Sequence, residues 1–221
     1  MVKDKDKSAL RKEIRARLAL LQSLEKESRS LLIADAVKSH LAVSGARVVA
    51  LYAPLFDEPL LWPLVEELAA RMLVLLPKVE GDVMDFYPYE PRYMATGAFG
   101  IIEPQGGEAV QPHEIDAIVV PGVAFTESGA RMGRGKGFYD RYLSQEEFRG
   151  LKIGVCYNEQ IVGELPVEPH DVKMDCVEHK GETGLHGVPF LIYVSVFGPA
   201  LVMKQESPVR GLSPCQWVCH P

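Results

Sequence analysis

The sequence has few cysteines, no long apolar run and no excess of positive charge. Its four cysteines in 221 residues show no disulfide framework, which favours reduced thiols in a cytoplasmic protein. The charged N-terminus lacks the apolar core of a signal peptide, and the apolar stretch at residues 190–197 is shorter than the ~20 residues of a membrane span. A formal net charge of −6 argues against nucleic acid as the main partner. We therefore expect a cytoplasmic protein without a membrane or nucleic-acid partner.

Two standard nucleotide-binding motifs are also absent. The Walker A motif requires Ser or Thr after its Gly-Lys pair, but Gly137 follows Lys136 in this chain. The dinucleotide fingerprint G-x-G-x-x-G fails because only one residue separates Gly135 from Gly137. Neither of these nucleotide-binding motifs therefore indicates a function.

The most informative segment that is present is the glycine-rich stretch at residues 133–141, GRGKGFYDR. Alternating glycines allow positive φ and let backbone N–H groups approach a ligand closely. Arg134 and Lys136 lie between them and suit phosphate, and the residues that follow suit the first turn of a helix. Asp140 is in a natural position to hold magnesium on the bound anion. The segment predicts an anion site, and the alternative is a mobile, solvated turn.

Helical patterns alternate with short apolar runs along the chain. Ordinary apolar and charged contents predict a soluble protein with one substantial core. The expected helices cover residues 7–21, 23–41 and 60–71, and the expected strands cover residues 47–52, 72–76, 84–87, 117–120 and 152–157. We expect the second strand to stop at Pro77. The alternation predicts a three-layer α/β/α domain with a mainly parallel, Rossmann-like sheet.

Ligands of such sheets bind beyond the carboxyl ends of the strands. The loops that leave those ends are residues 53–58, residues 121–136 and the stretch after residue 157. The glycine-rich segment belongs to the second of these loops. Strand order and loop composition therefore agree on the position of the predicted anion site.

A basic stripe runs along the first expected helix, because Lys7, Arg11 and Arg15 are spaced four residues apart. The stripe is either a solvated face or a group whose first turn reaches an anion.

The C-terminal residues 183–221 lose the alternation and are rich in proline. Cys215, Cys219 and His220 are too few and badly spaced for a closed zinc site. We interpret this segment as a tail without assigned function and residues 1–182 as the folded domain.

The segment Pro121–Phe125, followed by Gly129, Arg131 and residues 133–143, resembles the signature of the 5-formyltetrahydrofolate cyclo-ligases, also called methenyltetrahydrofolate synthetases. The resemblance covers about residues 7–178. Further residues match the family's pattern and follow one another in the family's order: Lys7 with Arg11, Glu58, residues 100–104, residues 115–116, Gln160, and residues 170–171 with Asp175.

This chain departs from the family pattern at two places. Phe138 stands where tyrosine is commoner, and Cys176–Val177 runs into Glu178–His179 where the family usually ends a strand on Thr-Glu.

The resemblance implies an enzyme that uses MgATP to convert 5-formyltetrahydrofolate into 5,10-methenyltetrahydrofolate, with release of ADP and phosphate. A formamide is a poor electrophile, so the γ-phosphoryl group would first be transferred to the formyl oxygen to give an iminium phosphate, which N10 of the folate attacks. Catalysis of this kind is mostly positioning and charge stabilisation. The implied partners are ATP, Mg²⁺ and a reduced folate, and we expect a monomer.

The resemblance also implies a role for each matching residue. Arg134 and Lys136 would be catalytic, by stabilising charge on the transferring phosphoryl group. Glu58 would hydrogen-bond the pterin and Phe99 would stack on it, while Asp140 and Asp171 would bind magnesium. The implied ATP-binding residues are Lys7, Arg11, Arg131, Met132, Gly133, Arg134, Gly135, Lys136, Gly137, Phe138 and Tyr139. Arg134, Gly135, Lys136, Gly137 and Phe138 would also contact the folate.

Each of these roles has a structural alternative. Glu58 is otherwise a surface residue in a proline-rich loop, and Phe99 otherwise a core residue. Asp140 is otherwise a helix N-cap, and Asp171 an ordinary loop carboxylate. For the whole chain, the alternative is a non-catalytic nucleotide- or folate-binding module with an altered C-terminus.

Overall fold

The structure, a computed structural model, describes residues 7–97 and 100–179. The predicted pterin-stacking residue Phe99, the predicted tail at residues 183–221 and its Cys215, Cys219 and His220 lie outside the described residues.

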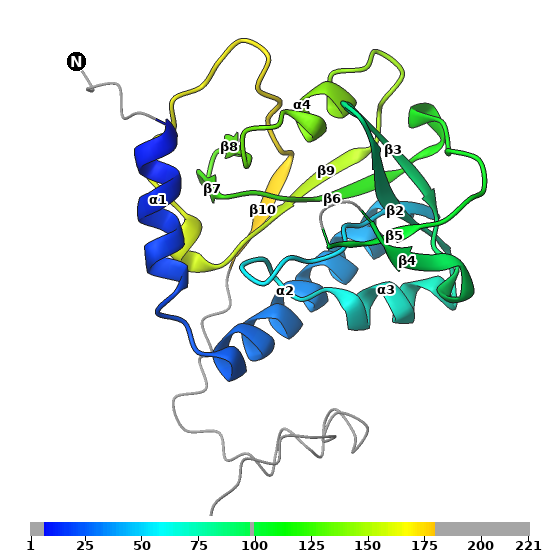
Figure 1. The fold of residues 1–221 in the computed structure, drawn as a ribbon, viewed down its shortest axis with the longest axis horizontal. Coiled ribbons are helices and arrows are strands. Elements are labelled where there is room, and N and C mark those ends of the chain that lie inside the picture. Colours follow the sequence, from blue (N-terminus) through cyan, green and yellow to red (C-terminus); the bar gives the residue numbers. More distant parts are fainter. Residues whose placement is uncertain (1–6, 98–99, 180–221) are drawn as a thin grey trace, which may run out of the picture. The chain divides into compact units, whose positions relative to one another are not determined.

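A six-stranded sheet forms the centre of the described chain (Figure 1). Its order is β10-β9-β6-β1-β2-β3, and every neighbouring pair is parallel except the β2–β3 hairpin. The bounds are β1 Val48–Ala50, β2 Leu73–Glu80, β3 Val83–Pro88, β6 Ala117–Pro121, β9 Leu151–Val155 and β10 Cys176–Glu178. The predicted mainly parallel α/β sheet is confirmed.

The strand order reverses next to β1. After β1 the chain builds outward through β2 and β3, then returns to place β6 on the other side of β1. The loops that leave β1 and β6 therefore diverge at one point of the sheet's carboxyl edge, where open α/β sheets bind their ligands.

Helices cover both faces of the sheet, because both faces of its strands are apolar. Alternate side chains of one strand face opposite layers: Val49 packs in the cluster formed by α1, α2 and α3, and Ala50 in the cluster formed with α4. Figure 1 shows α2 and α3 on one side of the sheet and α4 on the other. The helices are α1 Lys7–Leu18, α2 Ser23–Ser44, α3 Trp62–Ala69 and α4 Phe138–Leu143. Among the described residues, no helix is long and apolar enough to cross a membrane.

Short elements connect this framework. They are the strand pair β4 Met94–Thr96 with β5 Ile102–Pro104, the strand pair β7 Ala124–Phe125 with β8 Arg131–Met132, and the 3₁₀ turns Pro91–Tyr93, Pro112–Glu114 and Asn158–Gln160. These elements have two or three residues each, so they show no periodicity from which a strand or turn could be predicted.

The prediction that the second strand stops at Pro77 was wrong. β2 continues to Glu80, and Pro77 pairs with Phe86 of β3. Because β1 pairs with β2 only as far as Leu75, Pro77 meets no second neighbour that needs its missing N–H, and proline is tolerated on such an edge. The predicted helix at residues 7–21 ends earlier, at Leu18.

Candidate active site

A cavity of about 550 Å³ lies where the loops after β1 and β6 diverge. Its wall also includes the first turn of α1, the β2–β3 hairpin and residues 168–171. Every predicted site residue that the structure describes lines it: Lys7, Arg11, Glu58, Arg131, Met132, Gly133, Arg134, Gly135, Lys136, Gly137, Phe138, Tyr139, Asp140 and Asp171. Segments far apart in sequence thus meet at one place.

The glycine-rich loop has the backbone conformation that its sequence predicts. Gly135 and Gly137 have φ of 102° and 68°, a region that side chains with a Cβ rarely adopt. Gly137 is also the N-cap residue of α4, which places Asp140 in the first turn. The alternative in which Asp140 caps this helix is therefore wrong.

The basic stripe of α1 is divided between the site and solvent. Arg11 Nε donates to the carbonyl of Gly133 at 2.9 Å, so the N-terminal part of α1 holds the glycine loop. Lys7 Nζ lies 3.1 Å from Asp171 Oδ2 and 3.2 Å from Glu168 Oε2. Arg15, one turn beyond Arg11, is exposed. The anion-reaching interpretation therefore fits the first turn of the stripe alone.

Charge pairing between Lys7 and Asp171 changes the pKa of both groups. Burial alone would lower the pKa of Lys7, but the hydrogen bonds and charges of Asp171 and Glu168 outweigh it and raise this pKa. Burial alone would raise the pKa of Asp171, but the backbone N–H of Glu168 and the ammonium of Lys7 outweigh it and lower this pKa. Both groups are therefore held in their charged forms.

Glu58 is buried, with 7% of its surface exposed, so the alternative of a surface residue is wrong. Arg134 donates to Glu58 Oε1 from Nε at 3.0 Å and from Nη2 at 2.9 Å, and it also pairs with Asp57. The backbone N–H of Leu55 donates to Glu58 Oε2 at 2.9 Å. Burial raises the pKa of Glu58, while Arg134 and Leu55 oppose that rise by stabilising the carboxylate.

A buried polar network holds the Glu58 loop from behind. The Tyr157 hydroxyl donates to the Glu58 carbonyl at 3.1 Å and lies 3.1 Å from Ser30 Oγ. Ser30 in turn accepts from the backbone N–H of Leu60 at 2.8 Å, and the Tyr52 hydroxyl donates to the carbonyl of Pro59 at 2.7 Å. Helix α2 and the segment that follows β9 therefore fix the loop that carries Glu58.

Arg131 links the glycine loop to the far side of the cavity. Its side chain is 2% exposed, and Nη2 lies 2.8 Å from Asp140 Oδ1. The backbone N–H of Val172 lies 3.4 Å from the same carboxylate oxygen. This contact brings the segment that carries Asp171 next to Asp140.

Lys136 differs from the other cations of the cavity because it is exposed. Across residues 7–97 and 100–179, no side chain forms an ion pair with its ammonium. It is therefore available to a bound anion without first breaking such a pair.

Residues 3–179 match the 5-formyltetrahydrofolate cyclo-ligase family. The chain belongs to this family.

Individual relatives of the chain support its assignment to the family. The 5-formyltetrahydrofolate cyclo-ligase of Mycolicibacterium smegmatis is 38% identical over 147 residues, which cover 62% of this chain and 74% of that protein. The cyclo-ligase of Mus musculus is 27% identical over 184 residues, with 76% and 91% covered. The solved 5,10-methenyltetrahydrofolate synthetase of Aquifex aeolicus superposes with a TM-score of 0.70 at 40% identity, covering 77% of this chain and 88% of that one. The synthetase of Mycoplasma pneumoniae gives 0.65 at 30%, with 78% and 97% covered.

The carboxylates of this cyclo-ligase cavity suit a magnesium ion. Asp140 and Asp171 both line it, and oxygen ligands are the ones that Mg²⁺ prefers. One or two carboxylates are enough, because Mg²⁺ on a nucleotide takes its other ligands from phosphates and water. Each carboxylate is already balanced by a cation, Arg131 or Lys7, so neither depends on a metal for its place in the fold.

Two groups of functional candidates were missed from the sequence. Glu103 is buried in the cavity wall, and burial raises its pKa although the nearby Lys78 opposes the rise. The supporting residues Ser30 and Tyr157 were also missed. Ser30 gave a usable signal, because it lies three, four and seven residues before Ile33, Ala34 and Val37 and so falls on the apolar face of the expected helix.

Proposed function

We propose that this chain uses ATP to convert 5-formyltetrahydrofolate into 5,10-methenyltetrahydrofolate, with release of ADP and phosphate. The observation that carries the proposal is the composition of one cavity. Cations and glycines with positive φ form one wall, and a buried carboxylate among apolar residues forms the other. The first wall suits a polyphosphate and the second suits a heterocycle with adjacent N–H donors.

The folate would bind against the Glu58 wall. A carboxylate can accept two adjacent hydrogen bonds from the pterin, provided that it stays ionised. Arg134 and Leu55 favour that ionised form, and the apolar side chains of Leu55, Val79 and Met84 supply surface for the ring. The wall therefore orients the formyl group toward the glycine loop.

The triphosphate would bind along the glycine loop and the first turn of α1. There Lys136 and Arg134 would stabilise the charge that develops as the γ-phosphoryl group moves to the formyl oxygen. In that step a bond from phosphorus to the formyl oxygen forms as the bond to ADP breaks. N10 then attacks the formyl carbon and loses its proton, and the carbon–oxygen bond breaks to release phosphate.

Asp140 and Asp171 would hold the magnesium ion that accompanies ATP. When bound there, the ion would neutralise phosphate charge during the transfer. We propose that the active unit is a monomer.

Formation of the methenyl product tests the proposal, since this compound absorbs strongly in the near ultraviolet. The full chain mixed with MgATP and 5-formyltetrahydrofolate should give rising absorbance and one ADP per product. Binding of both substrates without any absorbance change would contradict the proposal and favour the non-catalytic module, for which the comparisons give no support.

A further inference from the structure

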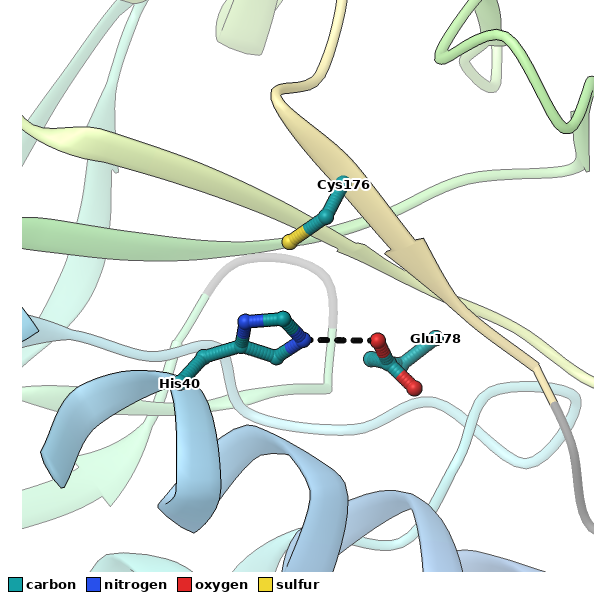
Figure 2. Close-up of side chains that lie close together, drawn as sticks. All are labelled: His40, Cys176 and Glu178. Carbon is teal, nitrogen blue, oxygen red and sulfur yellow. Dashed lines mark hydrogen bonds and ion pairs between the residues drawn. The ribbon is translucent and has the colours of Figure 1, made fainter. Parts of the chain in front are cut away.

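A second cluster of reactive side chains lies away from the cavity, between α2 and β10. Cys176 and Glu178 are two residues apart on β10, so both face the layer of α2, where His40 lies. Figure 2 shows the three side chains pointing toward one another, with His40 Nε2 2.7 Å from Glu178 Oε1. The three residues do not line the cavity described above.

The chemistry of the cluster is that of a zinc site. Its sulfur, nitrogen and oxygen ligand atoms all lie within 4.8 Å of one another. In a tetrahedral zinc site, metal–ligand distances of 2.0–2.3 Å place ligand atoms roughly 3.3 to 3.8 Å apart. Side-chain shifts of about an ångström would therefore bring the three ligand atoms to tetrahedral spacing. His40 and Glu178 would have to move apart and give up their hydrogen bond.

The cluster is also accessible to an ion. The side chains of His40 and Glu178 are 36% and 23% exposed, and Cys176 is half-buried. Partial exposure leaves an entry path and room for a water ligand. The other described group of three possible metal ligands, Glu168, His170 and Asp171, contains no sulfur, and it lines the cavity. The two groups therefore differ in the metal that they prefer, since a thiolate favours zinc and carboxylates favour magnesium.

We propose that His40, Cys176 and Glu178 bind one zinc ion, with water as the fourth ligand. The thiolate and the carboxylate balance the two charges of the ion. The ion joins helix α2 to the edge strand of the sheet and so stabilises the folded chain by mass action.

Zinc binding at this site releases a proton. The ligand would be the Cys176 thiolate, so the thiol must lose its proton when the ion binds. Because the ligand is the thiolate, the affinity for zinc increases with pH.

Cobalt titration of the full, metal-free chain tests the site, with Co²⁺ as a spectroscopic substitute for zinc. We expect one Co²⁺ per chain with a thiolate-to-cobalt absorption band in the near ultraviolet, displaced by Zn²⁺. The band should disappear in Cys176→Ser. The affinity for Co²⁺ should fall at least about tenfold in His40→Gln and in Glu178→Gln, because loss of a residue that only hydrogen-bonds a metal ligand already lowers metal affinity by about that much. Zinc should raise the melting temperature of the original chain relative to EDTA.

Two control variants separate this site from others. His170→Ala removes the only histidine of the cavity group, and Cys215→Ser with Cys219→Ser removes the C-terminal thiols. Both controls should keep the cobalt band and the affinity. A band that is lost only in the C-terminal variant, binding that is unchanged in Cys176→Ser, or no binding by the original chain would overturn the proposal.

Discussion

The two walls of the cavity are built in different ways. The proposed phosphate wall consists mainly of one short segment, residues 133–137, whose shape comes from its own glycines and whose exposed cation Lys136 forms no ion pair with the described residues. The proposed folate wall, Glu58 with the apolar side chains beside it, depends on long-range contacts. Glu58 is held by Arg134 of the other wall and by Tyr157, which follows β9. Removing one group should therefore slow the chemical step strongly at the first wall, and weaken substrate binding more moderately at the second.

Arg134 joins the two walls. Its guanidinium comes from the glycine loop and binds the carboxylates of Asp57 and Glu58. A substitution at Arg134 changes both walls at once. The variants that test one wall alone therefore leave Arg134 in place.

The largest effect is expected for Lys136→Ala. Loss of a cation that acts on the transferring phosphoryl group should lower kcat by about 10²- to 10³-fold. Folate should still bind, because the Glu58 wall is intact. Near-ultraviolet progress curves and equilibrium folate binding measure the two quantities. Lys12→Ala, an exposed position on α1, is the control, and wild-type turnover in Lys136→Ala would refute the role given to this residue.

Glu58→Gln should act on the folate alone. Loss of charge-assisted hydrogen bonds should weaken folate binding about 10- to 100-fold and leave ATP binding unchanged. Asp57→Asn is the matched control, because Asp57 also pairs with Arg134 but does not line the cavity. Equal losses in the two variants would mean that Glu58 acts by anchoring Arg134 and not by binding the pterin.

The pH dependence of folate binding sharpens the same test. Burial raises the pKa of Glu58 above its ordinary value of 4.5. As pH falls, Glu58 therefore takes up its proton sooner than an exposed glutamate does, and folate affinity should fall with it. Because the fold favours the protonated form, the contribution of Glu58 to stability decreases as pH rises through its raised pKa. Glu58→Gln should remove this part of the pH profile.

Arg11→Ala should have an intermediate effect. Removing its hydrogen bond to Gly133 and its charge should weaken ATP binding about tenfold, with little change in folate affinity. Arg15→Ala, on the same stripe but exposed, should match the original chain. Isothermal titration with a non-hydrolysable ATP analogue measures both. Equal effects would show that the stripe acts through its general charge.

Tyr157→Phe should have the smallest effect. It removes one hydroxyl that supports the Glu58 loop without touching the cavity lining, so KM for folate should rise about two- to tenfold and kcat should barely change. Steady-state kinetics at saturating ATP separates the two constants. A fall in kcat with KM unchanged would show that the network serves the chemical step and not the folate wall.

The sequence alone predicted the phosphate wall better than the folate wall. Alternating glycines with Arg134 and Lys136 are a local pattern, so the conformation of the loop and its place in the cavity could be predicted, while its phosphate chemistry stays a prediction. Glu58 could not be distinguished from a surface residue by its neighbours, because its burial depends on Tyr157 and Ser30, which are distant in sequence. Only the family resemblance assigned it a role. The cluster of His40 with Cys176 and Glu178 had no sequence signal, because it depends on the packing of α2 against β10.

Following the formyl oxygen tests the central claim most directly, namely that the two walls bring the γ-phosphoryl group onto that atom. The substrate is 5-formyltetrahydrofolate labelled with ¹⁸O in the formyl group, and the phosphate released in a single turnover is measured by mass spectrometry. The account predicts one ¹⁸O in each phosphate released. Unlabelled phosphate released together with methenyl product would contradict it.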